Sequence, residues 1–151
     1  CFKVRFHPLW TYIEGIREFG RFFCEQGSPD ARLAERAQVI IQEALENVVK
    51  YSVPGPLSEF EVRLSRGGSQ LEISIVSSPA QPHLLDLREE MRRVAETDPE
   101  TAYISAFERA ATSPSASARL GLARMRYEGA ADLSVTEEAD GRIRLTARSS
   151  L

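Results

Sequence analysis

The sequence predicts a two-layer α/β sandwich, in which helices cover one face of a mixed, mostly antiparallel sheet. Two hairpins supply most of this sheet, and each contains two short segments of alternating apolar and polar residues joined by a glycine-containing turn. Amphipathic segments with helical spacing lie before and between the hairpins. Strands with a single apolar face need helices on that face and leave the other face to solvent, which gives two layers.

Length and composition predict one globular domain that spans residues 1–151. Of the 151 residues, 42% are hydrophobic and 27% charged, and the net charge of −3 gives no basis for binding nucleic acid or an anionic membrane. No apolar run approaches the roughly 18 residues of a membrane-spanning helix. Cys1 and Cys24 have no framework or metal-binding spacing, so we predict free thiols and a cytoplasmic location. Because the sequence begins with Cys rather than Met, we expect the natural chain to begin earlier.

The N-terminal third is predicted to form a strand and two helices. Residues 2–6 alternate as a short strand, and residues 8–27 have the apolar spacing of a helix that ends at a glycine. The motif Ser28-Pro29-Asp30 predicts the next helix start, with the serine hydroxyl as the cap and the acid near the positive end of the dipole. This second helix is expected over residues 30–52, and Pro54-Gly55-Pro56 ends it.

The rest of the chain is predicted to form two hairpins separated by helices. In order, we expect strands 59–64 and 71–76 around a Gly67-Gly68 turn, helices 84–96 and 99–111, a mobile loop 112–118, a helix 119–128, and strands around 133–135 and 143–145 joined at Asp140-Gly141. Each hairpin is expected to have one buried face and one face in water, with Glu59 and Glu61 on the water side.

The most informative residues lie in the predicted helix 30–52, where Glu43 and Asn47 are about one helical turn apart. Lys50 and Tyr51 follow at the end of the same helix. A carboxylate beside a carboxamide, with an ammonium group one turn further on, can hold a hydrated Mg²⁺ ion and a polyphosphate. This is because Mg²⁺ takes few protein ligands and completes its shell with water and phosphate oxygens. On an ordinary amphipathic helix, the same side chains would only form a solvated face.

The pattern E-x-x-x-N-x-x-K-Y resembles the N box of the GHKL superfamily of histidine kinase-like ATPase domains, and the order of predicted elements is similar to the GHKL (Bergerat-like) fold. The small size is closest to the anti-sigma-factor serine kinases of that superfamily. The resemblance implies an ATP site in which Glu43 is the general base, Asn47 the Mg²⁺ ligand and Lys50 a phosphate contact. Tyr51 would pack near a pocket of the size of a nucleobase.

The adenine-binding motif of that superfamily is altered in this chain. The strand 71–76 should lead into D-x-G-x-G, whose Asp accepts a hydrogen bond from the adenine amino group. Here the strand leads into Ser77-Ser78-Pro79-Ala80-Gln81-Pro82. Ser77 or Ser78 would be a weaker acceptor than a carboxylate, and the two prolines stiffen a turn that the family makes with glycine.

The phosphate loop is altered as well. The family sequence G-x-G-L-G-L becomes SARLGL over residues 117–122, which keeps Leu120 and Gly121 but has Ser117 and Arg119 in place of the first two glycines. The surviving half predicts a helix N-terminus with some affinity for anions. Arg119 either pairs with a phosphate or lies across the pocket and fills it, and both alternatives stay open.

Three functional hypotheses follow from these motifs. The first is a signalling domain that acts through protein–protein interaction, has little or no affinity for ATP and Mg²⁺, and is not an enzyme. The second is an active ATP- and Mg²⁺-dependent serine kinase of the anti-sigma-factor type, and the third is a domain that uses the same pocket for another ligand. The expected partner is a signalling protein, either like an anti-sigma antagonist or like a response regulator, and a homodimer is a further alternative. The altered motifs favour the first hypothesis.

The predicted helical insertion at residues 84–111 is either a nucleotide lid or a docking surface. Apolar rows run along both of its helices, with Leu84, Leu87, Met91 and Val94 in the first and Tyr103, Phe107 and Ala110 in the second. These rows either pack on the pocket or form an exposed partner surface. The charged residues of the first helix are expected to form a solvated face: Arg88, Glu89, Glu90, Arg92 and Arg93.

Overall fold

The computed structural model describes residues 1–112 and 117–151, with side chains throughout except at residues 117–119. The elements in chain order are β1 (Phe2–Phe6), α1 (Trp10–Gly27), α2 (Ala31–Tyr51), β2 (Ser58–Leu64), β3 (Gln70–Ser77), α3 (Gln81–Glu96), α4 (Pro99–Thr112), α5 (Ser117–Tyr127), β4 (Ala131–Glu137) and β5 (Ile143–Ser150). The strands form one sheet in the order β1-β2-β3-β5-β4, and every neighbouring pair is antiparallel. The predicted α/β sandwich is confirmed, but its described sheet is antiparallel throughout rather than mixed.

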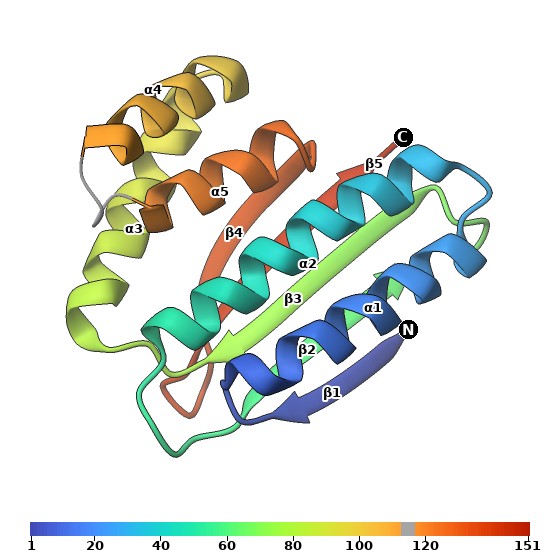
Figure 1. Ribbon diagram of the computed structural model, residues 1–151, viewed down its shortest axis with the longest axis horizontal. Coiled ribbons are helices and arrows are strands. Elements are labelled where there is room, and N and C mark those ends of the chain that lie inside the picture. Colours follow the sequence, from blue (N-terminus) through green and yellow to red (C-terminus); the bar gives the residue numbers. More distant parts are fainter. Residues whose placement is uncertain (113–116) are drawn as a thin grey trace.

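The helices form a single layer on one face of the sheet, with a separate group at one end (Figure 1). Helices α1 and α2 lie side by side along the strands, where α1 contacts β2 and α2 contacts β3 and β5. Helix α5 packs on α2 and β4, and the insertion formed by α3 and α4 attaches mainly through α5 and β4. Within the described residues, no helix has the length and apolar character needed to cross a membrane.

Helix α2 supplies most of the helical side of the core. Its long apolar side chains at positions 33, 40, 41 and 45 are completely buried, and they pack against the inner face of the strands. Burial of one such side chain contributes roughly 1.5–3 kcal/mol, so α2 is fixed firmly on the sheet. The largest buried side chains of the core are Leu33, Ile40, Ile41, Leu45, Phe60, Leu71, Ile73 and Met125.

The start of α2 differs from the prediction. Asp30, not Ser28, is the cap, because the Asp30 carboxylate accepts a hydrogen bond from the Arg32 backbone N–H at 2.8 Å. Ser28 instead ends α1, and its hydroxyl donates to the carbonyl oxygen of Gly68 at 2.7 Å. The serine is therefore used by a contact between the α1–α2 turn and the β2–β3 turn, which local sequence does not reveal.

Both predicted hairpins form at the predicted turns. The glycines that allow these turns have positive φ, with values of 95° at Gly67, 69° at Gly68 and 83° at Gly141. The outer face of the first hairpin is less exposed to solvent than predicted, because Glu59 and Glu61, which were expected in water, are each only 9% exposed. Basic side chains from neighbouring strands cover Glu59, including Lys3 of β1 with a nitrogen-to-oxygen distance of 2.7 Å.

The insertion also differs from its prediction in three respects. Helix α3 begins at Gln81, inside the turn that was expected to be proline-stiffened, because Pro82 fits the first turn of a helix. Helix α4 extends to Thr112, so the predicted loop starts later, and residues 113–116 lie outside the described residues. The second apolar row divides: Tyr103 stacks on Tyr127 of α5 with a ring-centroid distance of 5.1 Å, whereas Phe107 is 58% exposed, and the buried residues of α4 are Ala102 and Ala106.

Candidate functional site

Glu43 and Asn47 lie on the face of α2 that meets α5. Glu43 is 8% exposed, and Asn47 is half-buried one turn further on. The helix α5 comes so close that a Cβ atom added at Gly121 would lie 2.8 Å from Glu43 Oε2 and 3.4 Å from Asn47 Nδ2. Gly121 therefore serves here as the point where α5 packs against the two polar side chains.

Arg124 of α5 binds the Glu43 carboxylate directly. Its Nη1 lies 2.6 Å from Glu43 Oε1, and its Nη2 lies 3.1 Å from Glu128 Oε2. Tyr103 of α4 donates from its hydroxyl to the other oxygen of Glu128 at 3.0 Å. These contacts form a chain of polar groups from the insertion through α5 to α2. We did not predict Arg124 from the sequence, because Arg124 and Glu128 have the spacing of an ordinary surface ion pair on a helix.

The environment of Glu43 has two opposing effects on its protonation. Burial raises the pKa of Glu43 above the ordinary value, and the positive charge of Arg124 acts in the opposite direction without cancelling the effect of burial. A carboxylate with a raised pKa is a suitable proton acceptor. In this structure, however, Glu43 Oε1 forms an ion pair with the guanidinium group of Arg124, so this oxygen is already engaged.

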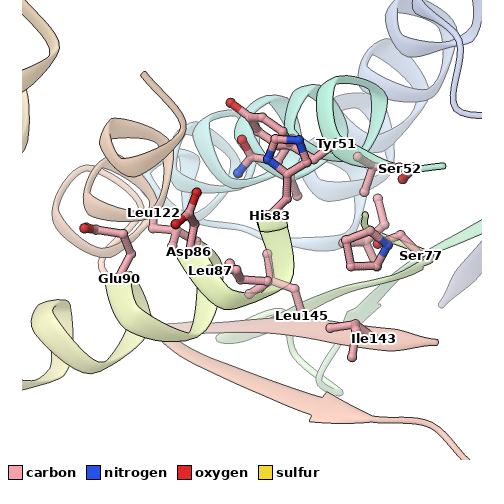
Figure 2. A pocket seen from close by; sticks show the side chains of 15 residues that line it. Tyr51, Ser52, Ser77, His83, Asp86, Leu87, Glu90, Leu122, Ile143 and Leu145 are labelled. Atoms are coloured by element: carbon pink, nitrogen blue, oxygen red, sulfur yellow. The ribbon is translucent and has the colours of Figure 1, made fainter. Parts of the chain in front are cut away.

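A cavity of about 260 Å³ lies next to Asn47, between α2, α3 and the ends of β3 and β5. Its floor is apolar and includes side chains of β3, β5, α3 and α5 (Figure 2). The polar lining residues are Asn47, Ser52, Ser77, Asp86 and Glu90, together with the rings of Tyr51 and His83. Asn47 is therefore the residue that connects this cavity to the Glu43–Arg124 pair.

Helix α3 contributes four residues to the cavity, of which the sequence predicts only Leu87, in the alternative in which its apolar row packs on the pocket. His83, Asp86, Leu87 and Glu90 all line it, and in Figure 2 they project from one side of α3. The prediction that Glu90 is solvated was wrong, because this side chain is 3% exposed and lies 3.5 Å from Arg93 and 3.8 Å from Arg109. The spacing of these positions, one helix face over two turns, was the available sequence signal.

Lys50 and Tyr51 lie in different surroundings. Lys50 is exposed, and its ammonium group lies 3.3 Å from Glu46 of the preceding turn, not among the residues that line the cavity. Tyr51 lines the cavity, and its ring lies against that of His83 with a centroid distance of 4.5 Å and an interplanar angle of 47°. The structure thus brings Asn47 and Tyr51 together at the cavity and leaves Lys50 outside it.

The two serines at the end of β3 also lie in different surroundings, since Ser77 is the last residue of the strand and Ser78 follows it. Ser77 lines the cavity, whereas Ser78 is absent from the lining and its carbonyl accepts a hydrogen bond from the Val53 N–H at 2.8 Å. A second backbone bond, from Ala80 N–H to the Tyr51 carbonyl at 3.0 Å, holds the same two segments together. The proline-rich turn is therefore tied to the end of α2 by backbone hydrogen bonds.

The altered phosphate loop forms the first turn of α5. Leu120 is half-buried, and its neighbour Leu122 is buried and lines the cavity. The side chain of Arg119 lies outside the described residues, so neither alternative for it is resolved. In the part of the chain that is described, no group of three or more His, Cys, Asp or Glu residues could hold a metal ion.

Comparison with known proteins gives a structural match but no family. No protein family matches this chain, and no curated protein matches it in sequence. Among solved structures, it is similar to a chain in the crystal structure of the SiaB–SiaC complex from Pseudomonas aeruginosa, with a TM-score of 0.66 and 17% sequence identity. The match covers 98% of this chain and 89% of that chain. At this identity the likeness shows the fold alone, and the GHKL resemblance stays a prediction.

Proposed function

We propose that this chain is a signalling domain that binds a protein partner, and that its cavity has little or no affinity for ATP. The observation that carries the proposal is the outer face of α4, where Ile104 and Phe107 are 50% and 58% exposed. These residues are adjacent on the helix surface, and α4 packs on the protein through Ala102, Ala106 and Tyr103 instead. An exposed apolar pair of this kind is suited to the centre of a protein interface.

Two further observations support the proposal. The similar solved structure is a complex of two proteins, which makes a protein partner a reasonable expectation for this fold. The Glu43 carboxylate is bound by Arg124, and Lys50 pairs with Glu46, so two of the groups expected to serve ATP are engaged within the protein. A partner with an apolar docking face, such as a SiaC-like or antagonist-like signalling protein, fits the exposed face of α4.

The test is calorimetry of the full chain with a SiaC-like protein from the organism that makes this chain, and the quantity measured is the affinity of the two proteins. The double variant Ile104→Ser, Phe107→Ser should weaken binding at least about tenfold, because apolar anchors at interface centres carry most of the binding energy. Its thermal unfolding should be nearly unchanged, since both side chains are already exposed. Met91, which we also predicted for this surface, packs against the core and is unsuitable for the test.

The matched control is Phe22→Ser, where the side chain is similarly exposed but belongs to α1, a helix that lies apart from α4 across the helical layer (Figure 1). This variant should bind with unchanged affinity. If Phe22→Ser weakens binding and the α4 double variant does not, the partner docks on α1 and the proposal for α4 is wrong.

The second candidate function is the serine kinase, and one observation favours it. Asn47 lines the cavity, and Gly121 lies against both Glu43 and Asn47, so the pair and the glycine of the family motifs are neighbours in space. Phosphate transfer from Mg·ATP to the partner protein, lost in Asn47→Ala, would establish the kinase in place of the proposed function.

A further inference from the structure

We propose that the cavity beside Asn47 binds a planar heteroaromatic small molecule that is neutral or positively charged. This inference rests on the proposed loss of tight ATP binding, and it assigns the cavity a ligand class of its own. Four observations carry it: the apolar walls, the paired rings of Tyr51 and His83, an unsatisfied hydroxyl, and the sign of the charge at the opening.

The size and the walls of the cavity define the shape of the ligand. About 260 Å³ is small for a ligand site, so it suits a single fused-ring system better than a complete nucleotide. Ile75 of β3 and Leu145 of β5 lie on one side and Leu87 of α3 on another. Apolar walls from β3, β5 and α3 favour an apolar ligand such as a fused ring, because its binding removes apolar surface from water.

The aromatic side chains add a preference for a ring, and especially for a cationic ring. Tyr51 and His83 are half-buried neighbours that line the cavity from α2 and α3, and Figure 2 shows their rings together on the same side of it. Ring faces attract aromatic groups by stacking and cations through the negative potential of the ring face. The pair comes from two different helices, so its position depends on the docking of α3.

Ser52 supplies a polar group that the protein itself does not use. Its hydroxyl oxygen is buried, and within the described residues it has no hydrogen-bond partner. A buried hydroxyl without a hydrogen-bond partner is unfavourable, because it has lost its bonds to water without replacement. Ser52 lines the cavity together with Ser77, so a ring nitrogen or an amino group of a ligand is a suitable partner for it.

The charge of the lining opposes a phosphate ligand. Its described residues include the carboxylates of Asp86 and Glu90 but no lysine or arginine. Arg93 and Arg109 balance Glu90 from outside the lining, at 3.5 and 3.8 Å. Asp86 is exposed and forms no ion pair within the described part of the chain, so its negative charge dominates the opening. Such an opening repels anions and attracts cations.

The experiment uses three bicyclic probes of similar shape and different charge: N-methylquinolinium, quinoline and quinoline-2-carboxylate. Each is titrated into the full chain near neutral pH, with calorimetry for affinity and NMR shifts of the His83 ring for location. We expect the cation and the neutral probe to bind, and the carboxylate and Mg·ATP to bind at least about tenfold more weakly than the cation. Equal or tighter binding of quinoline-2-carboxylate or Mg·ATP would overturn the inference, as would no binding of any probe.

Two variants test the residues. Asp86→Asn should reduce the preference for the cation over the neutral probe at least about threefold, while quinoline itself binds as before. His83→Ala should weaken both probes, because it removes one of the two rings. The control is Asp140→Asn in the β4–β5 turn, which should leave all affinities unchanged. An unaltered cation preference in Asp86→Asn would show that the charge argument is wrong. The Ile104→Ser, Phe107→Ser variant should bind the probes normally, so failure here is distinguishable from failure of the partner proposal.

Discussion

At the scale of single residues, the contact between Arg124 and Glu43 controls the charge of the buried acid. The folded state raises the pKa of Glu43 above its value in the unfolded chain. Between the two pKa values the folded state therefore holds more protons, and this residue makes the protein less stable as the pH rises through that window. Arg124 limits the effect, because its positive charge stabilises the ionised form.

Arg124→Gln should therefore destabilise the protein more at neutral than at acidic pH. Near neutral pH we expect the free energy of unfolding to fall by about 1–2 kcal/mol, because a partly buried carboxylate loses its partner. At a pH below the unfolded pKa of Glu43, the acid is protonated and the loss should be much smaller. Urea unfolding at both pH values measures this. In a Glu43→Gln background the same substitution should have little effect, and an equal loss in both backgrounds would contradict the argument.

The residues of the candidate site were only partly predictable from the sequence. Glu43 and Asn47 were identifiable because both lie on one helix, where spacing fixes their relative positions. Arg124 and His83 come from other helices, and their approach to α2 depends on how the insertion and α5 dock. Glu90 was misjudged for the same reason: a charged residue within a charged run is normally solvated, and only the tertiary fold places this one inside.

At the scale of elements, the β2–β3 turn offers a test of the difference between backbone strain and steric clash. Gly67 and Gly68 both have positive φ, but only Gly68 lies against another segment. A Cβ atom at Gly68 would lie 2.3 Å from the Gly27 carbonyl oxygen, whereas a Cβ atom at Gly67 would meet nothing within 4 Å. A side chain at Gly68 would therefore combine backbone strain with a steric clash, whereas a side chain at Gly67 would cause backbone strain alone.

We expect Gly67→Ala to lower the free energy of unfolding by about 1 kcal/mol and Gly68→Ala by about 2–4 kcal/mol. The larger loss reflects movement of the α1–α2 turn, which also carries the hydrogen bond from the Ser28 hydroxyl to Gly68. Chemical denaturation of the two variants under the same conditions makes the comparison. Equal losses would show that the turn can move away from Gly27 without difficulty.

The elements themselves were predicted well where local sequence determines them. Helix α2 and both hairpins follow from apolar periodicity and from glycines at turns, which are local signals. The start of α3 and the packing face of α4 were not predictable in the same way. The proline at position 82 predicts a rigid turn, but it is equally compatible with the first turn of a helix, which is where the structure has it. In α4 the small Ala102 and Ala106 are buried, and of the two aromatic residues Tyr103 contacts α5, while Phe107 is exposed.

At the scale of the whole molecule, the core and the insertion differ in how firmly they are held. Helix α2 has nine buried residues, whereas α3 and α4 have two each, Glu90 and Val94 in one and Ala102 and Ala106 in the other. The insertion attaches at one end of the sheet, mainly to α5 and β4 (Figure 1). We therefore expect it to open without separating α1 and α2 from the strands that they cover.

Native-state hydrogen exchange should show this difference directly. We expect backbone amides of α3 and α4 to exchange through local opening at a free energy at least about 2 kcal/mol below that of α2 and β3, because few buried apolar contacts must be broken. Val94→Ala should accelerate exchange in the insertion and leave α2 nearly unchanged, since the lost contact lies outside the main core. Bound N-methylquinolinium should slow exchange in α3, which supplies His83 and Asp86 to the cavity. If α3, α4 and α2 instead exchange at one common free energy, the domain opens as a single unit, and the insertion is an integral part of its core.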